Sequence, residues 1–192
     1  MTSQFGRTIP AISLAVVLAS CTAAPTSPTA LNNMTSPGGG SLWLDIGPLS
    51  STDRQVLAFA AVVARTFAQL GNLAQARGDQ FAVTQFGQQM NQENTLALED
   101  LYNTSNGEVE LHMRLDPREQ AIYDALARLS GSDFDAAYMI AMVQLMPQAI
   151  QIFRQAAPSV KPKIAEHLLD RAGRLNTHLS TVRNLVGETN GF

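Results

Sequence analysis

The chain is poor in cysteine, in tryptophan and in charge. It has 192 residues, with one cysteine, one tryptophan and 15% charged residues. A single cysteine excludes an internal disulfide and excludes a zinc site built from several cysteines. The 13 basic and 16 acidic side chains form no basic stripe of the kind that neutralises phosphates. We therefore expect no nucleic-acid partner.

Motifs for catalysis are also missing from the sequence. It contains no His-Glu-x-x-His, no Gly-x-Ser-x-Gly, no phosphate-binding loop and no Glu-x-x-His pair of the di-iron type. Acidic pairs occur at Glu99–Asp100 and at Asp133 with Asp135, on polar faces or at helix starts. Acids there serve solubility and the helix dipole. We expect no enzyme activity, no catalytic residue, no cofactor and no bound metal.

The one cysteine follows an apolar run near the start of the chain. Arg7 precedes the 11 uncharged residues 8–18, and the small residues Ala19 and Ser20 follow. This is the layout of an export signal, and the run is too short to span a bilayer. The ending "LASC" resembles the lipobox of bacterial lipoproteins. That resemblance implies a signal peptide over residues 1–20 and an acylated Cys21 at the mature N-terminus.

The lipobox resemblance also implies a location. It predicts a lipoprotein that faces the periplasm and contacts the membrane through its acylated N-terminus. Thr22 follows the cysteine, which by resemblance to lipoprotein sorting favours the outer membrane. The alternative is an ordinary signal peptide that is cleaved nearby, for instance after Ala24, and leaves no anchor.

Residues 21–52 have the composition of a flexible tether. The stretch "TAAPTSPTALNNMTSPGGGS" is rich in Thr, Ser, Pro and Gly and has no charge. Such a segment buries too little apolar surface to offset its ordering entropy. Trp43, near the end of the tether, fits packing on the end of the folded domain better than contact with a membrane or partner.

From residue 53 onward the apolar residues recur with a helical period. Steps of three and four dominate four stretches, and no alternating strand pattern of comparable length occurs. The four apolar stripes are Val56, Ala60, Val63, Phe67, Leu70 and Ala74; Val83, Phe86, Met90, Ala97 and Leu101; Met139, Met142, Met146, Ile150 and Phe153; and Ile164, Leu168, Ala172, Leu175, Leu179, Val182 and Val186. We predict an all-α domain over residues 53–187 and a short tail over residues 188–192.

Turn and cap residues divide this domain into helices. Gly78 ends the first helix and Asp79 is the predicted N-cap of the second. Asp116-Pro117 opens a short helix, Ser132 is the predicted N-cap of the next one with Asp135 as its capping-box partner, and Pro162 lies at the start of the last. The prediction is a four-helix bundle with one long connection that contains a short crossover helix.

Two stretches of the later helices carry a family resemblance. "LARLSGSDFDAAYMIAMVQLM" followed by "AEHLLDRAGRLNTHLSTVRNL" is similar to a bacterial exported family, the domain of unknown function 4142. "LGNLAQARGDQFAVTQFGQQM" resembles its first helical pair. The resemblance covers about residues 55–186 and implies a ferritin-like bundle and an envelope location. The family's activity is not established, so no reaction is implied.

The resemblance also implies where metal ligands would lie. The family commonly has histidines and a glutamate in the bundle, and the matching positions here are Phe67, Asn94, Met146 and His178. Only His178 keeps a ligand type, because the other three are apolar or amide side chains. These four degenerate ligand positions predict a bundle without metal. The alternative is a periplasmic, ferritin-like protein that binds iron or another divalent metal through other residues.

Three further sets of residues remain as candidates for a site. His167, Arg171, Arg174 and His178 share one helical shoulder, which fits a solvated face better than an anion-binding groove. The methionine stripe of Met139, Met142 and Met146 fits core packing better than soft-metal binding. Asn94 is the one amide in its apolar stripe and is expected to bond across the bundle. His112 has no pattern around it.

Together these observations predict a lipid-anchored envelope protein of unknown activity. Its helical bundle would serve as a binding or structural module. Its partner would be an envelope protein or ligand that the sequence does not identify.

Overall fold

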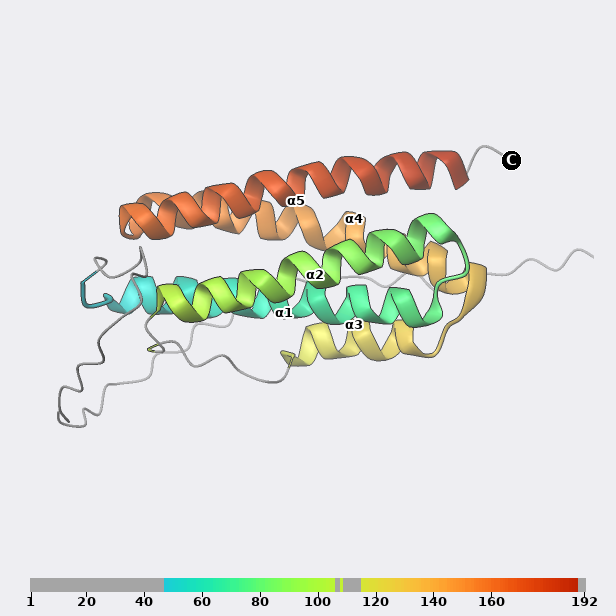
Figure 1. Ribbon diagram of the computed structural model, residues 1–192, viewed down its shortest axis with the longest axis horizontal. Coiled ribbons are helices and arrows are strands. Elements are labelled where there is room, and N and C mark those ends of the chain that lie inside the picture. The colour runs from blue at the N-terminus through green and yellow to red at the C-terminus, as the bar shows by residue number, and fades with distance from the viewer. Residues whose placement is uncertain (1–46, 106–107, 109–114, 190–192) are drawn as a thin grey trace, which may run out of the picture. The chain divides into compact units, whose positions relative to one another are not determined.

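The computed structural model describes residues 47–105, 108 and 115–189. The predicted signal peptide, Cys21, Trp43 and His112 lie outside the described residues, as do most of the tether and residues 190–192 of the tail. All regular secondary structure in the described part of the chain is helical, with no strand, which confirms the all-α prediction. Figure 1 shows its arrangement.

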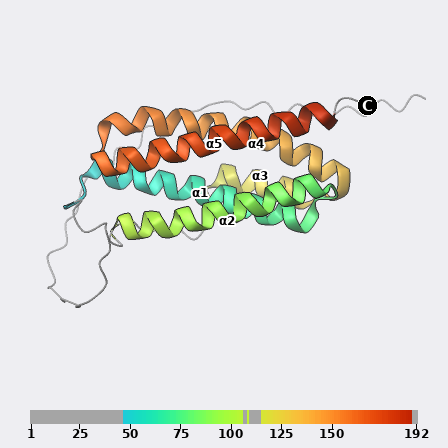
Figure 2. The same cartoon turned by 45° about the horizontal axis from the view of Figure 1, so that its top comes forward.

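Five α-helices make up the described part of the chain. Their order is α1 (Ser51–Arg77), α2 (Phe81–Thr104), α3 (Pro117–Ala127), α4 (Gly131–Ala156) and α5 (Pro162–Thr189), with a 3-10 turn, η1 (Ala157–Ser159), between α4 and α5. Four helices are long and α3 is short, as the periodicity predicted. α1 packs mainly on α2, and α4 packs mainly on α5 (Figures 1 and 2).

The contact between α1 and α2 depends on two facing glycines. A Cβ atom added at Gly71 would lie 2.6 Å from the carbonyl oxygen of Gly87 and 2.7 Å from the backbone nitrogen of Asn91. One added at Gly87 would lie 2.8 Å from the carbonyl oxygen of Gly71. Because these are contacts with backbone, the two helices approach more closely here than any side chain would allow. The Asn91 side chain also donates to the Ala68 carbonyl at 2.9 Å.

A buried carboxylate joins the start of α1 to the start of α5. Asp53 is 1% exposed and accepts hydrogen bonds from the backbone nitrogen of Ser50 at 2.9 Å and of Lys161 at 3.1 Å. Ser50 caps α1 in return, since its hydroxyl accepts from the Asp53 backbone nitrogen at 3.0 Å. Burial alone would raise the pKa of Asp53, but these hydrogen bonds and the Lys161 charge lower it below the usual value.

The sequence predicted that Asp135 caps its own helix, and this prediction was wrong. Its side chain instead reaches the turn between α1 and α2. Its carboxylate accepts from the backbone nitrogens of Asp79 at 3.1 Å and of Gln80 at 2.9 Å. The N-caps are correspondingly Gln80 for α2 and Ser130 for α4, rather than Asp79 and Ser132. The crossing bond places the starts of α2 and α4 at the same end, so the two helices run parallel (Figure 1).

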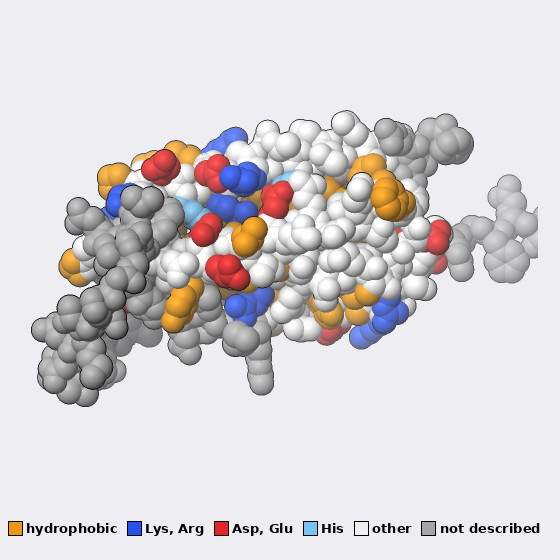
Figure 3. Space-filling model, viewed as in Figure 1, with side chains coloured by type: hydrophobic (Ala, Val, Ile, Leu, Met, Phe, Trp, Pro, Cys, Tyr) orange, Lys and Arg blue, Asp and Glu red, His pale blue; other side chains and the backbone are white. Residues whose placement is uncertain are grey.

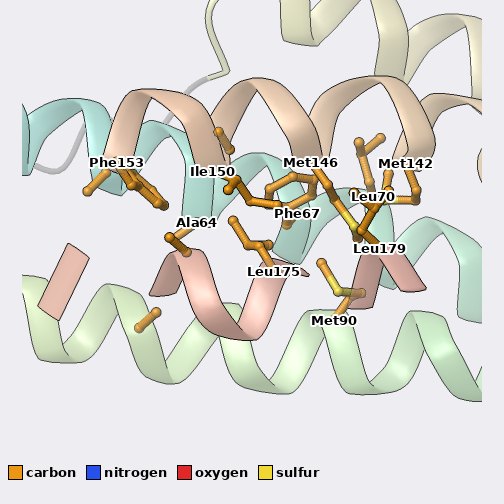
Figure 4. Close-up of a cluster of buried hydrophobic side chains, with 14 of the residues drawn as sticks. Ala64, Phe67, Leu70, Met90, Met142, Met146, Ile150, Phe153, Leu175 and Leu179 are labelled. Carbon is orange, nitrogen blue, oxygen red and sulfur yellow. The ribbon is translucent and has the colours of Figure 1, made fainter. Parts of the chain in front are cut away.

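The core lies between the two helix pairs and contains most of the predicted stripe residues. Met90, Met142 and Met146 have no exposed surface, and Phe67 is 2% exposed. Figure 4 shows Phe67 and Met146 among the side chains that meet at the centre of this core. The methionine stripe therefore packs inside, as expected from its spacing. Pro147 lies inside α4 and removes one backbone donor there.

Two of the described helices, α1 and α4, are long and apolar enough to cross a membrane. The apolar windows of both helices are partly buried inside the bundle, to 61% in α1 and 39% in the helix Gly131–Ser159 that begins with α4.

Candidate functional site

A cluster of polar side chains lies between α2 and α5. We call Glu93, Asn94, Arg171 and His178 the polar cluster. Asn94 is 1% exposed and Arg171 is 8% exposed. The Asn94 side chain accepts a hydrogen bond from Arg171 and donates one to the Met90 carbonyl at 2.7 Å. The expected bond of Asn94 across the bundle is therefore present, and its partner is a guanidinium.

Glu93 and His178 form the second bridge of the polar cluster. His178 Nε2 lies 2.8 Å from Glu93 Oε2, and Gln89 Nε2 donates to Glu93 Oε1 at 2.8 Å. Burial alone would raise the pKa of Glu93, but the bonds from His178 and Gln89 and the charges of His178 and Arg171 lower it overall. The cluster therefore favours a carboxylate at Glu93. The His178 ring also meets the Phe86 ring edge to face, with 5.9 Å between their centroids.

The helical shoulder of His167, Arg171, Arg174 and His178 was predicted to be one solvated face, but only part of it is exposed to solvent. Arg174 is exposed and pairs with Asp170 of its own helix at 2.8 Å. His167 is half-buried, and its Nε2 has no hydrogen-bond partner. Burial lowers the pKa of His167, and the nearby Arg171 cation lowers it further. Burial also lowers the pKa of Arg171, which faces the helix interface and not solvent.

The four degenerate ligand positions fall into two different environments. Phe67 and Met146 contribute only apolar surface and a thioether to the core (Figure 4). Asn94 and His178 belong to the polar cluster, and each is already bonded to a neighbour. In the described ranges, no group of three or more His, Cys, Asp or Glu side chains could hold a metal ion.

The donor set of the polar cluster does not fit a divalent metal. Glu93 and His178 are the only two anionic or imidazole donors in it, and they are bonded to each other. Arg171 adds a fixed, poorly solvated positive charge beside them. Structural and catalytic zinc sites have three or four protein ligands, and a nearby cation weakens metal binding electrostatically. The cluster instead has the geometry of an internal ionic and amide bridge between two helices.

Sequence reasoning missed Glu93 and Arg171 as members of this cluster. Both are charged, and charged residues are rarely buried unless they are paired. A signal was present nonetheless: Arg171 precedes Ala172 of the apolar stripe, and Glu93 precedes the inward-facing Asn94. Only the packing of α2 on α5 shows that the helix face with Glu93 and the helix face with Arg171 meet. Tyr138 was also missed, although it is fully buried between Phe86 and Phe134 and burial raises its pKa.

The fold and the polar cluster define an all-helical protein with two antiparallel helix pairs and a bridged helix interface. The chain belongs to the family described as "Domain of unknown function (DUF4142)", whose family model matches residues 46–185. No curated protein and no solved structure matches the chain.

Proposed function

We propose that this protein is a lipid-anchored envelope protein whose bundle is a non-enzymatic binding or structural module. In this proposal the mature chain begins at an acylated Cys21, faces the periplasm and is sorted to the outer membrane. The support for the anchor is "LASC" directly after an uncharged apolar run. Several acyl chains on one cysteine would give stable attachment, because each buried CH₂ contributes about 0.8 kcal/mol.

The bundle itself is proposed to be ferritin-like. Its support is topological: α2 and α4 run parallel, so the chain between them returns along the bundle (Figure 1). A four-helix bundle with one such long connection is the ferritin-like arrangement. α3 lies on this return path, which matches the crossover helix expected from the sequence.

The observation that carries the non-metal proposal is the bond between Arg171 and Asn94. It places a cation and an amide at a helix interface where a metal-dependent bundle needs carboxylates and imidazoles. Phe67 and Met146 supply neither. A protein of this kind acts through its surface and its membrane attachment, with an unidentified envelope protein or ligand as its partner.

A second candidate function is divalent-metal binding by a ferritin-like protein. One observation favours it: Glu93 and His178, 2.8 Å apart, are the carboxylate and imidazole that iron, zinc and manganese accept. Against it stand the missing third ligand among the described residues and the charge of Arg171.

Thermal unfolding separates these two candidates. We expect the melting temperature of the full-length chain to be unchanged by excess chelator and by added iron, zinc, manganese or copper. A metal present at 100 times its dissociation constant would stabilise the native state by about 2.7 kcal/mol, which raises the melting temperature by several degrees. Met146→Ala is the control: it should cost roughly 2–5 kcal/mol by emptying core volume, equally with and without chelator. Stoichiometric metal and a chelator-sensitive melting temperature would establish the second candidate.

Mass spectrometry of membrane-fraction protein tests the anchor. We expect the mass of residues 21–192 plus acyl groups, because the lipoprotein peptidase cuts before the modified cysteine. Cys21→Ser should leave the precursor uncleaved by that peptidase, since a serine hydroxyl is not the thiolate nucleophile that the lipid transfer requires. An unmodified mature protein that begins beyond residue 21 would show that the segment is an ordinary signal peptide.

A further inference from the structure

A groove of about 480 Å³ lies between α2 and α5, next to the polar cluster. Its lining is dominated by four exposed glutamines of α2, joined by a hydroxyl of α5: Gln85, Gln88, Gln89, Gln92 and Thr181. The glutamines are spaced i, i+3, i+4 and i+7, so they share one face over about 10 Å of helix axis. This volume falls within the range of about 300–1,000 Å³ that is usual for small-molecule sites.

The inner wall of the groove is continuous with the polar cluster. Gln89 lines the groove and also donates to Glu93 at 2.8 Å. Phe86 closes the floor at 4% exposure and packs edge to face on His178. The bridge between Glu93 and His178 therefore holds α2 and α5 in place at one end of the groove. A site whose walls are held by such bonds is preorganised, which lowers the entropy cost of binding.

The surface around the groove is nearly uncharged. Residues 81–92 of α2 contain no charged side chain, and Arg183 is the one lysine, arginine, aspartate or glutamate in residues 175–187 of α5. Exposed amide and hydroxyl side chains occupy this stretch of α5: Asn176, Thr177, Ser180, Thr181 and Asn184. In Figure 3 the charged side chains gather over one half of this face, and the middle of the face is mostly white. Globular chains contain about 25% charged residues on average, so a surface stretch with one such residue is polar but nearly neutral.

We propose that this groove binds a short neutral oligosaccharide. Each glutamine amide presents both donors and an acceptor, and a sugar hydroxyl is likewise donor and acceptor, so the two match without any charge. Among the described residues, no cation lines the groove, which disfavours phosphate or another anionic ligand. The apolar side chains that line the groove in the described part of the chain are Ala82, Phe86 and Leu185, which offer no series of pockets for alternate side chains of an extended peptide.

This inference deepens the proposed binding role and rests on it. It depends neither on the lipid anchor nor on the absence of metal, since none of the lining residues takes part in either. Because Phe86 is buried in the floor, it provides no exposed ring for stacking on a sugar. The affinity must then come from hydrogen bonds between the protein and the sugar. Each of them replaces hydrogen bonds to water and so contributes little net free energy. We expect a dissociation constant on the order of 1 mM.

Titration of the full-length chain with three neutral trisaccharides, chitotriose, maltotriose and cellotriose, tests the assignment. We expect saturable binding of at least one of them by NMR, with little change between low and high salt because no charge takes part. The double variant Gln88→Ala with Gln92→Ala should weaken binding at least fivefold. Its matched control is Gln144→Ala with Gln151→Ala, which removes two exposed glutamines of α4 outside the groove and should leave binding unchanged.

Three results would overturn the proposal. They are the absence of saturable binding for all three sugars, equal binding by the groove variant and the wild type, and groove-dependent binding of a blocked neutral tripeptide without any sugar binding. The last result would keep the proposed binding role and change only its ligand class. Membrane attachment and metal content are measured separately, so failure here is distinguishable from failure of the proposed function.

Discussion

Gly71→Ala should lower the free energy of unfolding by about 2–4 kcal/mol, because the added methyl group meets backbone. The added methyl carbon would lie 2.6 Å from the Gly87 carbonyl oxygen and 2.7 Å from the Asn91 backbone nitrogen. Both atoms belong to the backbone of α2, so no side chain can rotate away. α1 and α2 must separate, which loosens packing along the pair. Chemical denaturation of the full-length chain measures the change.

The control for this substitution is Gly173→Ala in α5. Gly173 has nothing within 4 Å of its added Cβ atom, so the replacement meets no steric barrier. Alanine is favoured over glycine inside a helix by about 1 kcal/mol, and Gly173→Ala should therefore stabilise the protein slightly. Two glycine-to-alanine changes of opposite sign would locate the effect in the helix contact. Equal effects at Gly71 and Gly173 would show that the close approach of α1 and α2 is not important for stability.

Asn94→Leu should cost about 3 kcal/mol, because it leaves the buried, charged Arg171 guanidinium without its amide acceptor. Leucine and asparagine are similar in size, so the loss comes from a buried charged donor without its hydrogen-bond acceptor and not from a cavity. The double variant Asn94→Leu with Arg171→Met removes both partners of the bond. It should recover most of the lost stability, since replacing a buried polar pair by apolar groups is often neutral or stabilising.

Arg174→Met provides the exposed counterpart of this test. Arg174 pairs with Asp170 in solvent, and the two side chains are 58% and 56% exposed. Exposed pairs of this kind contribute about 0–1 kcal/mol to stability. Arg174→Met should therefore change the free energy of unfolding by less than about 1 kcal/mol. If Asn94→Leu is as mild as Arg174→Met, Arg171 has another adequate partner and the polar cluster is not a structural bridge. If the double variant is worse than the single one, coupling between the two residues is also refuted.

The helical stripes and the break points show how far periodicity alone determines this fold. Core positions such as Phe67, Met90 and Met146 followed from spacing, because an apolar face must be buried wherever a helix packs. Pro117 marked a helix start through its fixed φ, which is a local property, and Gly78 lies at a helix end with an extended backbone, at φ −66° and ψ 146°. The inward position of Asn94 followed from the same spacing. The N-terminal predictions for Cys21 also rest on sequence alone and stay predictions.

Only the tertiary structure decided which polar groups meet. Asp135 was predicted to cap its own helix, but it caps the turn before α2, because that turn's free backbone donors lie beside it in space. Arg171 and His178 looked like one shoulder with Arg174, yet two of them are buried against Asn94 and Glu93 and the third is in solvent. Periodicity assigns a side chain to a face of its own helix. It does not determine which helix covers that face, and a charge is stable in the interior only when the covering helix brings a partner.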